Sequence, residues 1–320
     1  MRLAFFISKA TPCNLKPETS TMPRIHEQTF PVRYDDCDPY GHVNHVAYLR
    51  LMQEAAFAAS AAAGYDFARY QQINRTWLIR ETDIEYLQPL RYGDSVTVKT
   101  WVVDFRRVRS RRAYELYRTG TSELVARAYT EWVFLDAQTL RPATIPPEMM
   151  TAFFPEGAPP AATRRERLPE APPPPPDVYQ QHRRVEWRDL DMVGHVNNAN
   201  YLAYLEDCAI QVAAACGWPL SRMVATGFAI IARHYQIEYY QAAVLDDELI
   251  VSTWFALRGP ATATRYYTIT RASDGALLVR AQALWVWADT QSGRPKRIPA
   301  DFLADFASNR AEVERLVTGD

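Results

Sequence analysis

The sequence repeats itself at one constant spacing. Gly41 recurs as Gly194, and 194 − 41 = 153. The same offset links a long series of identical residues: Asp36 with Asp189, Asp38 with Asp191, Tyr48 with Tyr201, Gly64 with Gly217, Ile84-Glu85-Tyr86 with Ile237-Glu238-Tyr239, Trp101 with Trp254, Tyr114 with Tyr267, Asp136 with Asp289, and Arg141-Pro142 with Arg294-Pro295. An unchanged offset means that neither copy has a net insertion between these positions. The sequence therefore predicts two tandem copies of one domain rather than a solenoid of short repeats.

A proline-rich segment lies between the two copies. It includes five consecutive prolines, Pro172 to Pro176. Proline has no N–H to donate to a helix or a sheet, and proline-rich segments act as extended spacers. We expect a first domain at residues 27–155, a linker at 156–180 and a second domain at 181–310, with a disordered lead at 1–26.

The composition is that of an ordinary globular protein. The formal net charge of the 320 residues is -1, and 48% of them are hydrophobic. A nucleic-acid-binding protein usually has a basic footprint, and no apolar run is long enough to span a bilayer. The four cysteines have neither disulfide-framework nor metal-ligand spacing. We expect a cytoplasmic protein with no metal, no other cofactor, no nucleic-acid partner and no membrane association.

Each copy predicts one long helix with defined ends. Asn44 and Asn197 are N-cap candidates, and Gly64 and Gly217 stand where a C-terminal cap belongs. Between them, apolar residues follow a helical spacing in both copies: Leu49, Met52, Ala56, Ala59 and Ala63, then Leu202, Leu205, Ala209, Val212 and Cys216. Small alanines on more than one face would let the helix pack closely into a surrounding sheet.

Strands follow the helix in each copy. We expect them at residues 77–87, 95–105, 112–119 and 124–135, and again at 228–240, 248–257, 264–271 and 277–288. The tryptophans in these segments (Trp77, Trp101, Trp132, Trp254, Trp285 and Trp287) are expected mostly in the core. The predicted fold class is α+β, with an antiparallel meander of about five strands wrapped around one helix in each domain.

A short motif precedes both helices. It reads Asp-x-Asp-x-x-Gly-His-Val-Asn at residues 36–44 and 189–197. With its helix and the later Ile-Glu-Tyr segment, it resembles the hotdog-fold thioesterases of the 4-hydroxybenzoyl-CoA and acyl-ACP types, over about residues 27–155 and 180–308. The resemblance implies two tandem hotdog domains that form an intrachain pseudo-dimer.

The resemblance also implies site residues. DCDPYG in the first copy is similar to the hydroxybenzoyl-CoA type, whose catalytic aspartate falls on Asp38. In the second copy, Asp191 and His195 match the acyl-ACP type, while Val193, like Tyr40 in the first copy, stands where that type has an asparagine. The candidate catalytic residues are Asp38, Asp191, His42, His195, Asn44 and Asn197.

Thioester hydrolysis needs few groups. A carboxylate at Asp38 or Asp191 could attack the carbonyl carbon or activate a water molecule. The developing oxyanion could be met by backbone N–H groups at the helix N-terminus, at His45 and Asn198. Thiolate is a good leaving group, so the chemistry needs no metal.

Structural roles compete with these assignments. Asp36 and Asp189 are more simply loop or capping residues, and Asp38 and Asp191 could form Asx turns. The histidines could bond the loop backbone and the asparagines could serve only as caps. Acidic residues at matching helix positions could orient a water or pair with arginines; these are Glu54 with Arg80, and Asp207 with Arg233.

Five arginines lie between Arg106 and Arg112. They could bind the phosphates of coenzyme A or an acidic carrier protein. A solvated hairpin is the simpler interpretation, and the second copy has no equivalent run.

The function expected is hydrolysis of acyl-CoA or acyl-ACP thioesters. A hotdog dehydratase or hydratase, and a non-catalytic acyl-thioester-binding protein, are the alternatives. The sequence leaves open the acyl group, the carrier, the choice between nucleophile and general base, and the pairing of two chains into a further homodimer.

Overall fold

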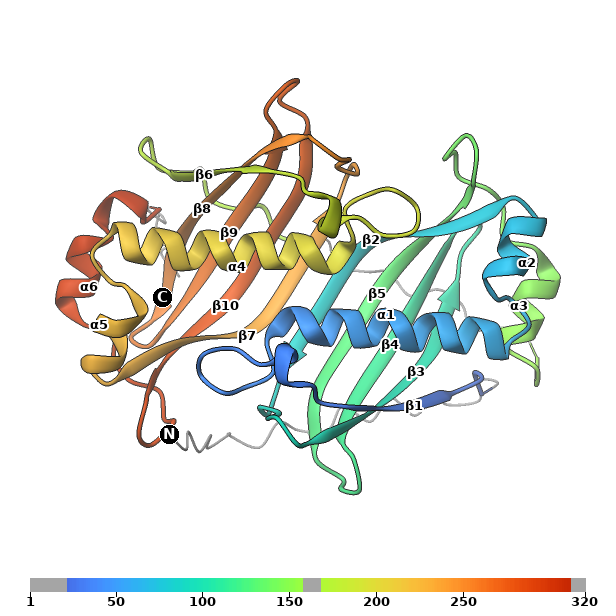
Figure 1. Ribbon diagram of the computed structural model, residues 1–320, viewed down its shortest axis with the longest axis horizontal. Coiled ribbons are helices and arrows are strands. Elements are labelled where there is room, and N and C mark those ends of the chain that lie inside the picture. The colour runs from blue at the N-terminus through green and yellow to red at the C-terminus, as the bar shows by residue number, and fades with distance from the viewer. Residues whose placement is uncertain (1–21, 158–167, 312–320) are drawn as a thin grey trace, which may run out of the picture. The chain divides into compact units, whose positions relative to one another are not determined.

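A computed structural model describes residues 22–157 and 168–311, which belong to two compact units (Figure 1). Residues 1–21 of the expected lead and residues 158–167 of the expected linker lie outside the described residues. At the start of the first unit, the N–H of Arg24 donates to the carbonyl of Phe153, and the first strand begins at His26. The strand that opens the second unit begins at Tyr179.

The first domain is one antiparallel sheet with a long helix. Its strands lie in the order β1-β3-β4-β5-β2. Its elements along the chain are β1 (His26–Pro31), η1 (Tyr34–Asp36), α1 (His45–Ala62), α2 (Phe67–Gln72), β2 (Arg75–Tyr86), β3 (Ser95–Phe105), β4 (Arg109–Arg118), β5 (Leu124–Asp136) and α3 (Pro147–Phe153).

The second domain repeats this topology. Its strands lie in the order β6-β8-β9-β10-β7, all antiparallel. Its elements are β6 (Tyr179–Arg184), η2 (Trp187–Asp189), α4 (Asn198–Ala215), α5 (Leu220–Ala225), β7 (Phe228–Tyr239), β8 (Glu248–Gly259), β9 (Thr262–Arg271), β10 (Leu277–Asp289), α6 (Ala300–Asp305) and η3 (Ala307–Asn309).

The long helix of each domain packs on its sheet. Figure 1 shows α1 and α4 each lying across the strands of their own domain. Helix α1 contacts β1 and β3, and α4 contacts β6 and β8. The buried face of α1 carries small side chains at Ala55, Ala56 and Ala59, which allow the close approach that the sequence predicted. The α+β prediction of a helix against a wrapped sheet is confirmed.

The predicted strand positions are also confirmed, with ends that differ by at most three residues. Strand β4 begins at Arg109, earlier than the expected residue 112, because Arg109 and Ser110 pair with Val133 and Trp132 of β5. Three of the six tryptophans expected in the core are buried there, Trp132, Trp254 and Trp287. The other three are partly buried.

The interiors of the two domains differ at one matched position. In the first domain the Thr130 hydroxyl accepts the indole N–H of Trp132 at 2.6 Å and hydrogen bonds with the Tyr114 hydroxyl at 3.1 Å. The second domain has Ala283 at this position of β10 (283 − 130 = 153). The indole N–H of Trp285 is consequently buried without an acceptor among the described residues.

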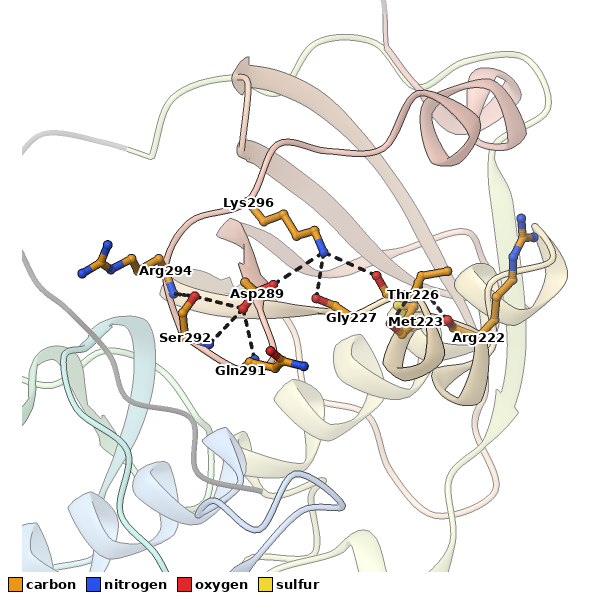
Figure 2. A network of polar contacts seen from close by, with 9 residues as sticks. All are labelled: Arg222, Met223, Thr226, Gly227, Asp289, Gln291, Ser292, Arg294 and Lys296. Carbon is orange, nitrogen blue, oxygen red and sulfur yellow. Dashed lines mark hydrogen bonds and ion pairs between the residues drawn. The ribbon is translucent and has the colours of Figure 1, made fainter.

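A polar network holds the turn that follows β10 in the second domain (Figure 2). The Asp289 carboxylate accepts the backbone N–H groups of Gln291 and Ser292 at 3.1 and 2.9 Å. The Lys296 ammonium donates to the carbonyls of Gly227 and Thr226 at 3.1 and 3.4 Å. This network fastens the turn to the start of β7, and it involves none of the predicted site residues.

Candidate functional site

The motif of the first domain folds into a small hairpin. The N–H of Asn44 donates to the carbonyl of Asp36 at 2.8 Å, and the N–H of Asp38 donates to the carbonyl of His42 at 2.8 Å. The turn closes where the N–H of Gly41 donates to the carbonyl of Asp38 at 2.9 Å. Aspartate, proline and glycine occupy the turn positions that favour them, and Gly41 adopts a φ of 74°.

The second domain builds the same hairpin. The N–H of Asn197 donates to the carbonyl of Asp189 at 2.9 Å, and the N–H of Asp191 donates to the carbonyl of His195 at 2.9 Å. Gly194 closes the turn with a φ of 83°. Two independent copies of the motif thus specify one backbone geometry.

The second aspartate of each motif forms an Asx turn. Oδ1 of Asp38 accepts the N–H groups of Tyr40 at 2.8 Å and His42 at 3.2 Å. Oδ1 of Asp191 accepts the N–H of Val193 at 2.9 Å. These bonds fix the direction of each half-buried carboxylate. A fixed, partly desolvated carboxylate is the geometry that nucleophilic or general-base chemistry needs.

The first aspartate of each motif has a structural role, as the simpler interpretation predicted. Oδ2 of Asp36 accepts the N–H of Arg33, and Oδ2 of Asp189 accepts the N–H of Glu186, both at 2.9 Å. The Asp189 carbonyl also accepts Nδ2 of Asn200 at 2.9 Å. These aspartates hold the short turns η1 and η2 that lead into the motifs.

The asparagines are N-caps. Oδ1 of Asn44 accepts the N–H of Val46 at 2.8 Å, and Oδ1 of Asn197 accepts the N–H of Ala199 at 3.0 Å. The helices therefore begin at His45 and Asn198, the residues predicted to carry the oxyanion-binding N–H groups. Gly64 and Gly217 follow the helix ends with positive φ, as the sequence predicted.

The two motif histidines are half-buried in their hairpins. Burial, with the charges of Arg91 and His45, lowers the pKa of His42 from 6.5 to about 4. His42 is therefore a neutral imidazole at neutral pH. In the second domain, Nδ1 of His195 is buried without a hydrogen-bond partner in the part of the chain that the structure describes.

Each hairpin is hydrogen bonded to a second loop. This loop follows β2 in the first domain and β7 in the second. The N–H of Val43 donates to the carbonyl of Leu90 at 2.8 Å, and the N–H of Val196 donates to the carbonyl of Ala243 at 3.0 Å. The Tyr201 hydroxyl, on α4, accepts the N–H of Ala243 at 2.8 Å. Tyr48 holds the backbone of Leu90 in the same way.

These supporting residues were not among the predicted site residues. Tyr86 and Tyr239 also belong to this group, because their hydroxyls donate to the carbonyls of His45 and Asn198. The available signal was the repeat itself, since each of these tyrosines recurs at the constant offset.

One acidic helix residue and the arginine run have local partners. Asp207 pairs with Arg183 of β6 at 2.8 Å, so the expected pairing with Arg233 is wrong. Within the run, Arg109 pairs with Glu131 at 2.7 Å, Arg111 lies over the Tyr129 ring at 4.1 Å, and Arg112 is buried. These contacts favour a structural role for the run, although buried Arg112 shows that it is not solvated throughout as expected. The run lies at the end of β3 remote from the hairpin, which is next to the start of β3.

Residues 32–153 and 185–306 each match the thioesterase-like superfamily. The chain belongs to the thioesterase-like superfamily. The two matched segments correspond to the two domains, so the superfamily fold occurs twice in the chain.

Relatives of this thioesterase-like chain include single-domain and longer proteins. The chloroplastic acyl-[acyl-carrier-protein] hydrolase FATB2 of Cuphea viscosissima is 22% identical over 82% of this chain and 62% of its own length. The putative acyl-CoA thioesterase YneP of Bacillus subtilis (strain 168) is 25% identical over 37% of this chain and 85% of its own. The chain thus spans less than two thirds of the longer relative.

A solved structure shares the fold of both domains of the thioesterase-like chain. The putative oleoyl thioesterase from Lactobacillus plantarum superposes with a TM-score of 0.70 at 17% identity, covering 82% of this chain and 96% of that one. The double hotdog expected from the sequence is confirmed as the fold. In the described part of the chain, no helix has the length and apolar character needed to cross a membrane.

Proposed function

We propose that this chain hydrolyses acyl thioesters of coenzyme A or acyl carrier protein to a free acid and a thiol. One observation carries the proposal. In both domains, an Asx turn fixes a half-buried carboxylate, Asp38 or Asp191, in a hairpin that leads directly into the N-terminus of an 18-residue helix. The names of the relatives, which include acyl-ACP and acyl-CoA thioesterases, support the same chemistry.

The reaction has two forms with these residues. As a nucleophile, a carboxylate oxygen bonds to the acyl carbon, the carbon–sulfur bond breaks, and thiolate leaves; water then cleaves the resulting anhydride. As a general base, the carboxylate takes a proton from water while the water oxygen attacks the acyl carbon, and the proton passes to the thiolate. In both forms of the reaction, Oδ1 of Asp38 or Asp191 stays hydrogen bonded to the backbone N–H of its turn.

The oxyanion forms at the acyl carbonyl in both cases. We assign its stabilisation to the backbone N–H groups of His45 and Asn198, at the helix N-termini. The partial positive charge of a helix N-terminus favours negative charge at this position. The side-chain oxygens of the caps Asn44 and Asn197 accept different N–H groups, those of Val46 and Ala199, one residue further along each helix.

The test is thiol release from short, long and aromatic acyl-CoA and acyl-ACP substrates by the double variant Asp38→Asn, Asp191→Asn. A loss of kcat of about 100-fold or more in a folded protein is expected if these carboxylates act on the acyl carbon or on water. The matched control is Asp36→Asn, Asp189→Asn, which makes the same chemical change at the structural aspartates. Equal losses in both double variants, or full activity in the first, would contradict the assignment.

Two further measurements separate the alternatives. Single turnover in ¹⁸O-labelled water places the label in an aspartate only in the nucleophilic form. A wild-type protein that binds acyl thioesters without releasing thiol would be a binding protein, and one that adds or removes water at the acyl chain would be a hydratase or dehydratase. The choice of carrier, the cytoplasmic location and a further homodimer stay predictions.

A further inference from the structure

Arg91 lies against the candidate catalytic hairpin of the first domain. An added Cβ on Gly41 would lie 3.9 Å from Nη1 of Arg91, and the Arg91 charge contributes to the lowered pKa of His42. The neighbouring residues fasten the two loops together, because the Leu90 carbonyl accepts the N–H of Val43. The backbone of Tyr92 also bonds the thiol of Cys37. The guanidinium is thereby held next to the turn that carries the candidate nucleophile.

Arg91 is half-buried, and its guanidinium forms no ion pair among the described residues. Two carboxylates in the adjoining segments are paired with other arginines. Asp35 pairs with Arg33 at 2.5 Å, and Asp94 pairs with Arg118. A partly buried guanidinium without an ion pair has N–H donors that can bind an external anion.

Two exposed aromatic rings lie in the same two segments. Tyr34 is 82% exposed and Tyr92 is 67% exposed, and their ring centres are 5.8 Å apart in an edge-to-face arrangement. Large exposed rings of this kind provide contact surface for a ligand base or an alkyl arm.

The second domain lacks the cation at the matched position. Val244 replaces Arg91 and Leu245 replaces Tyr92 (244 − 91 = 153). Trp187 and Met192, which correspond to Tyr34 and Pro39, are 80% and 84% exposed. The second hairpin therefore has apolar residues, Val244 and Leu245, at the positions where the first has Arg91 and Tyr92.

We propose that Arg91, with Tyr34 and Tyr92, binds a phosphate of the thiol carrier beside the first hairpin. The inference rests on the proposed thioester hydrolysis and names the group that recognises the carrier. The phosphate has two sources, the 4′-phosphopantetheine arm shared by both carriers and the nucleotide of coenzyme A. The arginine run at Arg106 to Arg112 is not this site, because it lies at the opposite end of β3 from Arg91.

The test compares Arg91→Val, which installs the second-domain residue, with wild type on one acyl group carried by four thiols. These are pantetheine, 4′-phosphopantetheine, coenzyme A and acyl carrier protein. We expect KM to rise about tenfold for thiols with the bound phosphate, as for loss of a charge-assisted hydrogen bond, with KM for acyl-pantetheine unchanged. A rise for acyl-phosphopantetheine assigns the arm phosphate, and a rise for acyl-CoA alone assigns the nucleotide. Arg91→Lys is expected to recover part of the affinity.

Arg184→Val removes the same charge from an exposed position of the second domain and is the matched control. A KM increase that is equal for acyl-pantetheine would overturn the proposal, because Arg91 would then act on the hairpin itself. Unchanged KM values for all phosphorylated thiols would overturn it too. If wild type hydrolyses none of the four, the proposed function fails; calorimetric Kd values for coenzyme A and pantetheine, with and without Arg91, then decide the phosphate site separately.

Discussion

The hydroxyl of Tyr86 donates a hydrogen bond to the carbonyl of His45, the first residue of helix α1, at 3.2 Å. The matched Tyr239 makes the same bond to Asn198 at 3.4 Å. Each tyrosine comes from a strand and contacts the peptide that follows the proposed oxyanion-binding N–H. Both domains thus fix the direction of the helix N-terminus from the sheet.

We expect Tyr86→Phe and Tyr239→Phe together to lower kcat about fivefold or more, from loss of about 1 kcal/mol of positioning at each helix start. KM should change little, because the ring that packs on the helix is kept. Steady-state kinetics and a thermal melt check this. A fall in Tm with unchanged kcat would show that the bonds serve stability only.

His42 should make the protein sensitive to acid. Its pKa is about 4 in the folded state against an ordinary 6.5, so the unfolded chain binds the proton first as the pH falls. The stability that neutral His42 contributes is complete above pH 6.5 and is lost as the pH falls to about 4. Urea unfolding at a series of pH values should show a shallower decline for His42→Gln, and parallel curves would contradict the prediction.

Gly194→Ala should destabilise the second domain by about 1–2 kcal/mol through the backbone alone. Gly194 has a φ of 83°, and beyond its two chain neighbours no atom lies within 4 Å of an added Cβ. The cost therefore comes from the local backbone conformation and not from a clash with another segment. Gly194→Asn should cost less, because asparagine tolerates this conformation better. Equal unfolding midpoints for wild type and the alanine variant would contradict the turn geometry.

Thr130→Val should cost about 1–3 kcal/mol, because it keeps the side-chain shape but leaves Tyr114 and Trp132 without their shared hydroxyl partner. Adding Tyr114→Phe should recover part of that loss, since one buried donor is then removed as well. Chemical denaturation of Thr130→Val, Tyr114→Phe and the double variant measures the coupling. Additive losses would show that the Thr130 hydroxyl does not serve Tyr114.

The sequence predicted what is local in the chain. The N-caps Asn44 and Asn197 follow from the residue type and the helical spacing after it, and both appear in the structure. The tandem domains follow from an offset that needs no structural knowledge.

The sequence could not predict which distant segments meet. Val43 and Leu90 are 47 residues apart (90 − 43 = 47), yet a backbone bond joins their loops. Arg91 becomes a candidate site residue only through that meeting, because its neighbours in sequence carry no motif. The early start of β4 at Arg109 likewise depends on a partner strand and not on local preference.

Ala283 occupies the repeat position equivalent to Thr130 and has no hydroxyl. This difference between the two domains has a consequence for how such a chain evolves. In an assembly of two identical subunits, every substitution appears in both halves, and a change that helps one half must be tolerated by the other. Covalent fusion removes that constraint. Each domain can accept its own substitutions, as Arg91 and Val244 already show. The two domains of one polypeptide can therefore take on different functions.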